Sequence, residues 1–339
     1  MKVLVTGASG FVGARAVAAM QADGHEVRAF VRSPEKLSRA LAPLGAEVSD
    51  VHTGDVTDRR AVEEAVAGCD AIVHTANIYT YDTRLAEEMW RVNVEGTNAV
   101  LEAGLAAGCD PVVHVSSMVA LLPYGGPIPS DPKFIDVKSG DPYVDSKKAA
   151  EAIARKHQEG DEPVVTVYLG SVWGPHDPGA GEMVKIARLF LNSPAPFALP
   201  GRIGIVDADA TGRLLSALLA PGRGPRRAVF GGPTVSWKGL GQIVIGAAGA
   251  KARPFLPTPY PVAALTGRVG QAISRVIGKE LPVHAGGPWV VRNWQPSDDS
   301  EAVALIGSVP PLEETVTKAT RWMVEAGLVK GGQPARSTG

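Results

Sequence analysis

The first half of the chain alternates short apolar runs, rich in β-branched residues, with longer segments whose apolar residues recur at helical spacing. This alternation predicts parallel strands joined by crossover helices. The strands are predicted at 2–6, 26–31, 71–74, 112–115 and 164–169, and the helices at 10–21, 62–67, 83–107 and 142–157. Because these strands are apolar almost throughout, we expect helices on both faces of a doubly wound parallel sheet, an α/β fold.

After residue 170 the pattern changes, and glycine and proline crowd 174–181, 194–204 and 221–233. Such punctuation predicts loops and small elements laid over one end of the sheet. Further helices are predicted at 206–219 and 312–327. We predict a sheet domain over 1–170 to which the chain returns around 202–232, a smaller C-terminal region over 171–201 and 233–330, and a flexible tail over 331–339.

A glycine-rich turn joins the first strand to the first helix. Glycines at this spacing let the chain turn tightly, let backbone N–H groups approach a pyrophosphate, and let the helix pack close to the strand. The position between a strand and a helix favours a Rossmann-type dinucleotide site over an ordinary turn. The residues expected to contact the cofactor here are Thr6, Gly7, Ser9, Gly10, Phe11, Val12 and Gly13.

The second strand ends in Arg32-Ser33, at the place where an acidic residue would bind the ribose hydroxyls of NAD. A guanidinium there can pair with a 2′-phosphate, so Arg32 predicts NADP as the cofactor in preference to NAD. The alternative is that Arg32 is a solvated surface charge.

A candidate proton-transfer pair follows. Tyr143 and Lys147 stand four residues apart in a predicted helix and therefore share one face. The strand before this helix ends in Ser116-Ser117, and ligands of open α/β sheets bind beyond the carboxyl ends of the strands. A serine hydroxyl there could hydrogen-bond a carbonyl oxygen while Tyr143 donates or removes the proton.

Free tyrosine ionises near pH 10, so a useful acid or base needs a pKa lowered by about three units, or about 4 kcal/mol. A solvated ion pair supplies at most about 1 kcal/mol. We therefore expect Lys147 to lower the pKa of Tyr143 from a partly dehydrated position, assisted by the positive charge of an oxidised nicotinamide.

These motifs together resemble the extended branch of the short-chain dehydrogenase/reductase family, which includes nucleotide-sugar epimerases and dihydroflavonol-reductase-like enzymes. The resemblance covers most of the chain. It rests on Thr-Gly-Ala-Ser-Gly-Phe-Val-Gly at 6–13, Gly-Asp-Val-Thr-Asp at 54–58, His-Thr-Ala-Asn at 74–77, Asn-Val-Glu-Gly-Thr at 93–97, Val-Ser-Ser at 115–117, Tyr143 and Lys147.

The resemblance implies a catalytic set of Ser117, Tyr143 and Lys147, with Ser116 as the alternative serine, and Asn93 supporting the active-site backbone. Lys147 would also hold the nicotinamide ribose. The further cofactor contacts implied are Asp55 and Val56 beside the adenine, Thr75, Ala76 and Asn77 near the ribose, Ser116, and Gly170 and Val172 in the loop beside the nicotinamide. A homodimer formed through the helices at 83–107 and 142–157 is also implied.

Two departures from the family pattern matter. The usual Arg-Pro before the Val-Tyr-Gly-Pro loop is replaced by Leu169-Gly170, and the Val-Tyr-Gly that usually follows the serine is absent as a direct run. The first change removes a cation, and a diphosphate substrate generally needs fixed cations, so both weaken an epimerase assignment. Trp173, in the same loop, is predicted to shape the pocket.

The uncharged segments 194–201 and 254–267 favour an apolar pocket. We therefore predict an NADP-dependent reductase or dehydrogenase acting on the carbonyl or alcohol of a small, largely apolar substrate, with 171–201 and 233–330 binding that substrate. One alternative is a nucleotide-sugar epimerase or dehydratase with tightly bound NAD. Another is a non-catalytic NADP(H) sensor.

Composition restricts the partners. The 34 lysines and arginines against 35 aspartates and glutamates give a formal net charge of −1, which argues against a nucleic-acid partner. Two cysteines without metal-ligand spacing predict no metal site and a reducing cytoplasm. The uncharged stretch 111–130 carries four prolines and is no membrane span. The apolar pattern at 262–277, with Arg268 and Arg275, could touch a membrane surface, but a core or lid helix is expected.

Overall fold

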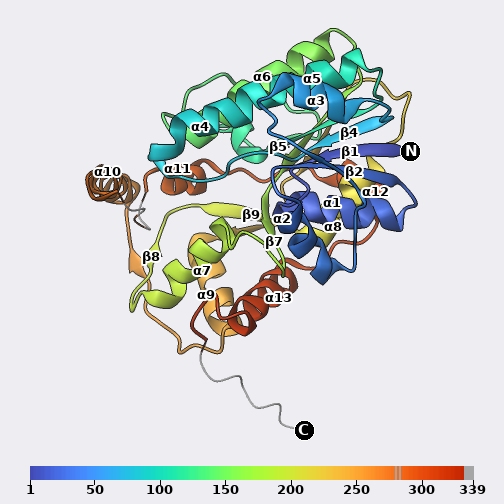
Figure 1. The fold of residues 1–339 in the computed structure, drawn as a ribbon. Coiled ribbons are helices and arrows are strands. Elements are labelled where there is room, and N and C mark those ends of the chain that lie inside the picture. Colours follow the sequence, from blue (N-terminus) through green and yellow to red (C-terminus); the bar gives the residue numbers. More distant parts are fainter. Residues whose placement is uncertain (279–280, 282–283, 332–339) are drawn as a thin grey trace.

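A computed structural model describes residues 1–278, 281 and 284–331. Its centre is a seven-stranded sheet in the order β10-β6-β5-β4-β1-β2-β3, with every neighbouring pair parallel (Figure 1). This confirms the predicted doubly wound sheet. The strands are β1 (Lys2–Thr6), β2 (Glu26–Val31), β3 (Asp50–Thr53), β4 (Ala71–His74), β5 (Val112–Ser117), β6 (Val164–Leu169) and β10 (Arg226–Phe230).

Helices cover both faces of this sheet because its strands are apolar on both sides. Val3 and Val5 of β1 pack in one core, while Leu4 between them packs in the other. The helices on the first face are α1 (Phe11–Ala22), α2 (Pro34–Leu41), α8 (Ala208–Ala217) and α12 (Ser300–Ile306), and those on the second are α3 (Arg59–Val66), α5 (Gly96–Ala106) and α6 (Pro142–Glu159).

The C-terminal region lies beyond the carboxyl ends of β5 and β6, and its residues Trp173 and Phe190 pack in one core with Met118 and Tyr168 of the first 170 residues. Its small sheets are β11-β9-β7 and β12-β8. The strands are β7 (Ser171–Trp173), β8 (Phe197–Ala198), β9 (Arg202–Asp207), β11 (Thr234–Ser236) and β12 (Leu256–Pro257), and the helices are α7 (Glu182–Asn192), α9 (Trp237–Ala247), α10 (Tyr260–Ile277), α11 (Gly286–Asn293) and α13 (Leu312–Glu325).

The segment predicted as one helix over 83–107 is interrupted. It consists of a 3-10 turn at Thr83–Leu85, α4 (Ala86–Trp90), a π-helical turn at Arg91–Glu95, and α5. The π turn contains Asn93, whose side-chain amide binds the backbone of Ile78. Such turns are frequent at functional sites, and this contact is the physical reason for the irregularity that helical spacing alone does not reveal.

Two other local predictions need correction, and one falls outside the described residues. Helix α2 and strand β3 lie in a stretch for which no element was predicted. Val206 and Asp207, predicted as the start of a helix, end β9 instead, because the carboxylate of Asp207 accepts the N–H groups of Asp209 and Ala210, each at 2.9 Å, and thereby caps α8. Residues 332–339 of the predicted tail lie outside the described residues.

Cys69 and Cys109 are both buried and unpaired, as the predicted absence of a disulfide framework requires. Burial raises the pKa of the Cys69 thiol, and it raises that of Cys109 to about 11. In the part of the chain that the structure describes, no helix is both long enough and apolar enough to cross a bilayer.

The contact between α1 and α8 depends on one glycine. A Cβ at Gly212 of α8 would lie 2.5 Å from the carbonyl oxygen of Arg15 in α1. We expect Gly212→Ala to lower the free energy of unfolding by about 1–3 kcal/mol through overpacking. Gly246→Ala in α9 is the matched control, because nothing lies within 4 Å of its Cβ position. Urea unfolding measures both, and equal stability of Gly212→Ala and wild type would contradict the close contact.

Candidate active site

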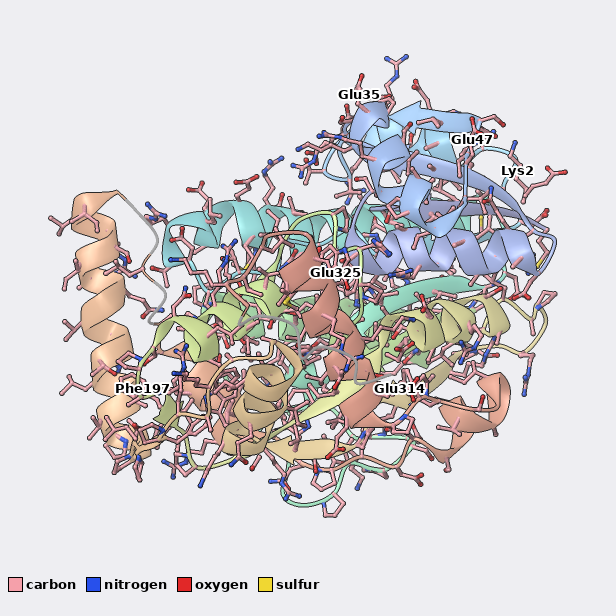
Figure 2. The ribbon with its side chains drawn as sticks, turned by 90° about the horizontal axis from the view of Figure 1, so that it is seen from below. Lys2, Glu35, Glu47, Phe197, Glu314 and Glu325 are labelled. Carbon is pink, nitrogen blue, oxygen red and sulfur yellow. The ribbon has the colours of Figure 1, made fainter. Side chains whose placement is uncertain are left out.

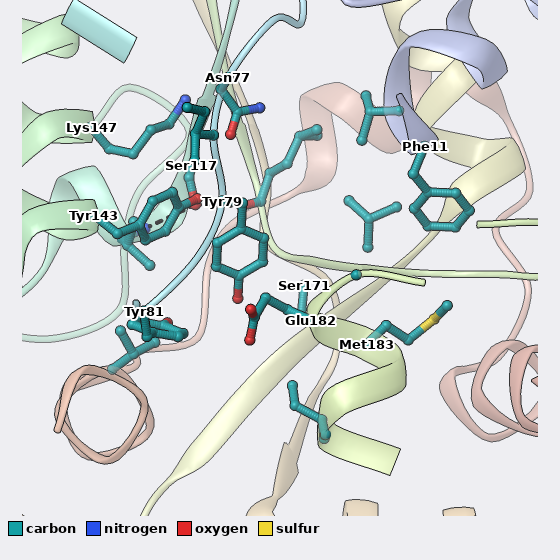
Figure 3. Close-up of a pocket in the computed structure, with 18 of the residues that line it drawn as sticks. Phe11, Asn77, Tyr79, Tyr81, Ser117, Tyr143, Lys147, Ser171, Glu182 and Met183 are labelled. Carbon is teal, nitrogen blue, oxygen red and sulfur yellow. Dashed lines mark hydrogen bonds between the residues drawn. The ribbon is translucent and has the colours of Figure 1, made fainter. Parts of the chain in front are cut away.

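A cavity of about 660 Å³ lies at the carboxyl edge of the large sheet and extends into the C-terminal region (Figure 3). The glycine turn, the ends of β2, β4, β5 and β6, and the helices α6 and α7 all contribute to its wall. Of the predicted site residues, those that line the cavity are Gly7, Ser9, Gly10, Phe11, Val12, Gly13, Arg32, Asp55, Val56, Thr75, Ala76, Asn77, Ser116, Ser117, Tyr143, Lys147, Gly170 and Val172.

The glycine turn leaves no room for side chains at two positions. Gly7 has a φ of +69°, and a Cβ there would lie 2.7 Å from the backbone nitrogen of Ala76. A Cβ at Gly13 would lie 2.2 Å from the carbonyl oxygen of Gly7. Helix α1 therefore begins close against the sheet, and its first turn has neither a side-chain cap nor an acidic residue. The positive end of this helix faces the cavity, and the cradle fits the pyrophosphate of a dinucleotide.

The three predicted catalytic side chains come together. Ser117 is the last residue of β5, and Tyr143 and Lys147 stand one turn apart on α6. Asp141 caps α6 by accepting the N–H groups of Tyr143 at 3.0 Å and of Val144 at 3.3 Å, and this fixes the start of the helix. The hydroxyl of Tyr143 lies next to the side chain of Ser117, and Figure 3 shows both beside Lys147.

Burial sets the charge states of this group. It raises the pKa of Tyr143 above its ordinary value, against the opposing effect of the neighbouring Ser117. Burial also lowers the pKa of Lys147 to about 8, with Glu151 opposing the change. The expected dehydrated position of Lys147 is therefore present, because its side chain is almost fully buried. The expected lowering of the pKa of Tyr143 is absent. Lys147 Nζ does not bond to the tyrosine but donates to the carbonyl oxygen of Val115 at 3.1 Å.

The two candidate serines differ in their surroundings. Ser117 is only partly buried, and its Oγ also donates to the carbonyl oxygen of Leu169 at 3.4 Å. Ser116 is buried, and its hydroxyl has no hydrogen-bond partner among the described residues. The geometry therefore pairs Ser117, rather than Ser116, with Tyr143.

Two predicted residues, Thr6 and Asn93, lie outside the wall of the cavity. Asn93 accepts the N–H of Ile78 at 2.7 Å and donates to the carbonyl oxygen of Ile78 and to Ser146 Oγ, each at 3.0 Å. Its amide thus holds the loop that follows β4. The carbonyl oxygen of Thr6 accepts the hydroxyl of Thr75 at 2.7 Å, which joins the ends of β1 and β4. Both residues position the site from behind.

Trp173 does not shape the pocket as predicted. Its side chain is fully buried in the same core as Phe190 and is not part of the cavity wall. The indole nitrogen donates to Ser171 Oγ at 3.0 Å, so β7 directs Trp173 away from the cavity that Ser171 and Val172 line.

Arg32 is exposed at the end of β2 and lines the part of the cavity next to Asp55. Among the described residues, no carboxylate forms an ion pair with its guanidinium. The neighbouring Ser33 is already engaged, because its Oγ caps α2 by accepting the N–H of Lys36 at 3.2 Å. Arg32 is thus the cation available to a ligand at this end of the cavity.

Sequence reasoning missed an aromatic cluster beside Tyr143. The ring centroids of Tyr79 and Tyr143 lie 4.5 Å apart, and those of Tyr81 and His284 are stacked 4.3 Å apart. All four residues line the cavity. Tyr79 and Tyr81 follow a predicted strand and could have been found from that position. His284 has no such signal. Burial lowers the pKa of His284 to about 4, so it is neutral at neutral pH.

The model of the NAD dependent epimerase/dehydratase family matches residues 3–195. The chain is 34% identical over 207 residues to a 3-beta-hydroxysteroid dehydrogenase from Mycolicibacterium neoaurum, across 56% of this chain and 51% of that enzyme. This match spans only about half the length of the dehydrogenase. A putative dihydroflavonol 4-reductase from Synechocystis sp. is 26% identical over 338 residues, across 96% of this chain and 95% of that protein.

Among solved structures, a UDP-glucose 4-epimerase from Bifidobacterium longum in complex with NAD+ and UDP is similar with a TM-score of 0.73 and 17% identity, over 97% of this chain and 99% of that one. This likeness shows the fold. The family match spans more than half of the chain and includes the glycine turn, Ser117, Tyr143 and Lys147. The chain therefore belongs to the NAD dependent epimerase/dehydratase family, in the extended branch of the short-chain dehydrogenases/reductases.

Proposed function

We propose that this chain is an NADP-dependent oxidoreductase that reduces the carbonyl of a small, largely apolar aldehyde or ketone, or oxidises the matching alcohol. The observation that carries the proposal is the position of the Tyr143 hydroxyl, next to Ser117, where the glycine-turn end of the cavity meets an apolar chamber. The chamber is lined chiefly by Met183, Ile186, Leu189, Phe190, Leu199, Ile203, Trp237, Val290 and Val291. Apolar walls with few polar anchors are typical of small-molecule pockets.

The residues present fit a nicotinamide dinucleotide. The close glycine turn and the uncapped start of α1 suit its pyrophosphate, and Arg32 suits a 2′-phosphate. Lys147, on the wall near Asn77, is placed to donate to ribose hydroxyls. When bound, the cofactor would supply or accept the hydride, which is chemistry that no side chain can perform.

The side chains would handle the proton. Because burial raises the pKa of Tyr143, its hydroxyl stays protonated at neutral pH, and this is the form that donates a proton to a carbonyl oxygen. Ser117 Oγ would hydrogen-bond the same oxygen and stabilise its developing charge. The buried ammonium of Lys147 favours the tyrosinate that remains, since opposite charges attract strongly in a dehydrated site.

The charges of the cavity argue against the nucleotide-sugar alternative. Among the described residues, Arg32 and Lys147 are the lysine and arginine side chains of its wall, and Asp177 and Glu182 contribute carboxylates on the α7 side. A diphosphate bound on that side would face the carboxylate of Asp177 and the Glu182–Lys185 ion pair, and no lysine or arginine of the described cavity wall lies there. A steroid and a dihydroflavonol, named in the two relatives, carry no phosphate. A non-catalytic sensor would have no need for the adjacent hydroxyls of Ser117 and Tyr143 inside the pocket.

Three sequence predictions extend this proposal. They are the division into a dinucleotide-binding domain and a substrate-binding region, a homodimer through 83–107 and 142–157, and a cytoplasmic location. The close packing of α4 on α6 in one layer supports the second, since both segments would then present a continuous helical surface.

Tyr143→Phe tests the proton donor. We expect turnover of a carbonyl compound that the wild type reduces with NADPH to fall by at least about 100-fold, since general acid catalysis contributes that much. NADPH binding, measured by fluorescence titration, should stay close to that of the wild type. Tyr79→Phe is the matched control, because it removes a hydroxyl from the same cavity. Unchanged turnover of Tyr143→Phe would refute the role of Tyr143.

Arg32→Ala tests the cofactor choice. A charge-assisted hydrogen bond to a 2′-phosphate contributes about 1.5–3 kcal/mol, so the Kd for NADPH should rise by about 10- to 100-fold. The Kd for NADH should not change. Arg39→Ala, an exposed arginine of α2 outside the cavity wall, is the control. A wild type that prefers NADH, or that purifies with bound NAD, would contradict the proposal and favour the epimerase.

The lowered pKa of Lys147 predicts a pH dependence of stability in the cofactor-free protein. Between about 8, the folded value, and the ordinary 10.5, the unfolded chain binds more protons at this residue, so stability rises with pH. Wild type should therefore gain about 3 kcal/mol relative to Lys147→Met over this range. Urea unfolding at several pH values measures the difference between the two proteins. A difference that does not vary with pH would show that Lys147 is not dehydrated.

A further inference from the structure

Helix α10 buries its small residues and exposes its large apolar ones. The positions that face the body of the protein are Ala263, Gly267, Gly270 and Ser274. A Cβ at Gly267 would lie 2.5 Å from the backbone nitrogen of Ala285, so the helix packs closely through these small residues. The large apolar residues point to solvent, and the prediction of a core helix was wrong in this respect. A core helix would bury the large residues instead.

The exposed residues form one stripe along the helix. Val262, Leu265, Val269, Ile273 and Val276 recur at intervals of three and four residues, which places them on one face. The side chain of Leu265 is 63% exposed and that of Val276 is 87% exposed. In Figures 1 and 2 the helix stands at the edge of the molecule, where this face is open.

The stripe continues beyond the helix. Phe197 of β8 and Leu256 of β12 are paired in register, both are exposed, and β12 lies just before α10 in the chain. Phe197 also lines the cavity, as do Ala263 and Thr266 of α10. We call Phe197, Leu256, Val262, Leu265, Val269, Ile273 and Val276 the apolar face; it borders the entrance side of the cavity. An exposed apolar surface of this extent marks an interaction site.

The charged residues of α10 are of one sign. Arg268 and Arg275 stand two turns apart on the same flank, and the helix contains no aspartate or glutamate. Among the described residues, no carboxylate pairs with Arg268, and Arg275 donates only to the hydroxyl of Thr83, at 3.2 Å. An apolar face flanked by cations is the pattern of helices that lie in the interface of an anionic bilayer.

A second copy of the chain fits this face less well. Two such helices would bring their arginines together without a carboxylate on either helix to pair with them. The helix has 18 residues and is therefore about 27 Å long, so one of its faces covers a few hundred Å². A stable protein interface buries about 800 Å² on each partner. The area of this surface is thus too small for a stable dimer interface, but it is sufficient for a helix that inserts shallowly into the lipid headgroup region.

We propose that α10 and the β8–β12 pair dock on an anionic membrane surface, with the apolar face among the lipid chains and Arg268 and Arg275 at the headgroups. The helix lies along the surface and does not cross it. The proposal does not depend on the proposed function. It adds that the cavity would open toward the bilayer, from which an apolar molecule could enter.

Flotation with lipid vesicles tests the docking. The full chain is mixed with phosphatidylcholine vesicles, or with vesicles of phosphatidylcholine and phosphatidylglycerol, at low salt. We expect binding to the mixed vesicles and little to the neutral ones, and release at high salt. The variant Leu265→Asp/Val276→Asp should stay in solution. Arg268→Gln and Arg275→Gln should each weaken binding by about fivefold.

Val303→Asp on α12 is the matched control, because Val303 is an exposed apolar residue outside the apolar face. Circular dichroism and thermal unfolding establish whether each variant is folded. We expect the aspartate variant to fold, because Val276 is highly exposed and its replacement disturbs no packing. Wild type that stays in solution with mixed vesicles, or an aspartate variant that floats like wild type, overturns the proposal. So does a change of mass in light scattering caused by Leu265→Asp/Val276→Asp without lipid, which would assign the face to a second copy.

Discussion

The cavity depends on how closely three pieces of backbone meet beneath it. The glycine turn, the end of β4 and the start of α1 approach within distances that no Cβ at Gly7 or Gly13 would permit. This contact places the first turn of α1 at the same edge where β5 and α6 deliver Ser117 and Tyr143. Side chains in the turn would push α1 outward and so separate the phosphate-binding end from the proton-transfer end. Packing of the backbone, rather than any polar interaction, therefore determines the distance that a ligand must span between the phosphate-binding end and the proton-transfer end.

Burial then decides the charge of what lines the site. The same loss of water raises the pKa of Tyr143 and lowers those of Lys147 and His284, so each is pushed toward its neutral form. Lys147 contributes less to Tyr143 in the protein alone than residue spacing suggests, because its ammonium has turned to a backbone carbonyl. A ligand that displaces this hydrogen bond would bring the ammonium into play. Without a ligand, burial thus keeps the hydroxyl of Tyr143 protonated.

The sequence predicted β1, β2, β4 and β6 to the residue, because each is a short, mostly apolar run bounded by residues that favour turns or helices. It could not predict the π turn at Asn93, which exists because of a contact with Ile78 across the fold. The motifs predicted most of the residues that line the cavity, because they lie at strand ends that the sheet topology brings together. The approach of His284 to Tyr81 depends on how the segment before α11 docks, and no local pattern encodes it. The sequence could not show which face of α10 is exposed, because helical spacing reveals an apolar stripe but not what packs against it.

The two cysteines have a practical consequence. Both are buried, and the pKa of each thiol is raised, so little thiolate is present at neutral pH to react with an alkylating reagent. The chain has no other cysteine. A single cysteine placed on the surface would therefore react selectively in the otherwise native protein. Spectroscopic probes can in this way be attached one position at a time, without first removing Cys69 or Cys109 from the core.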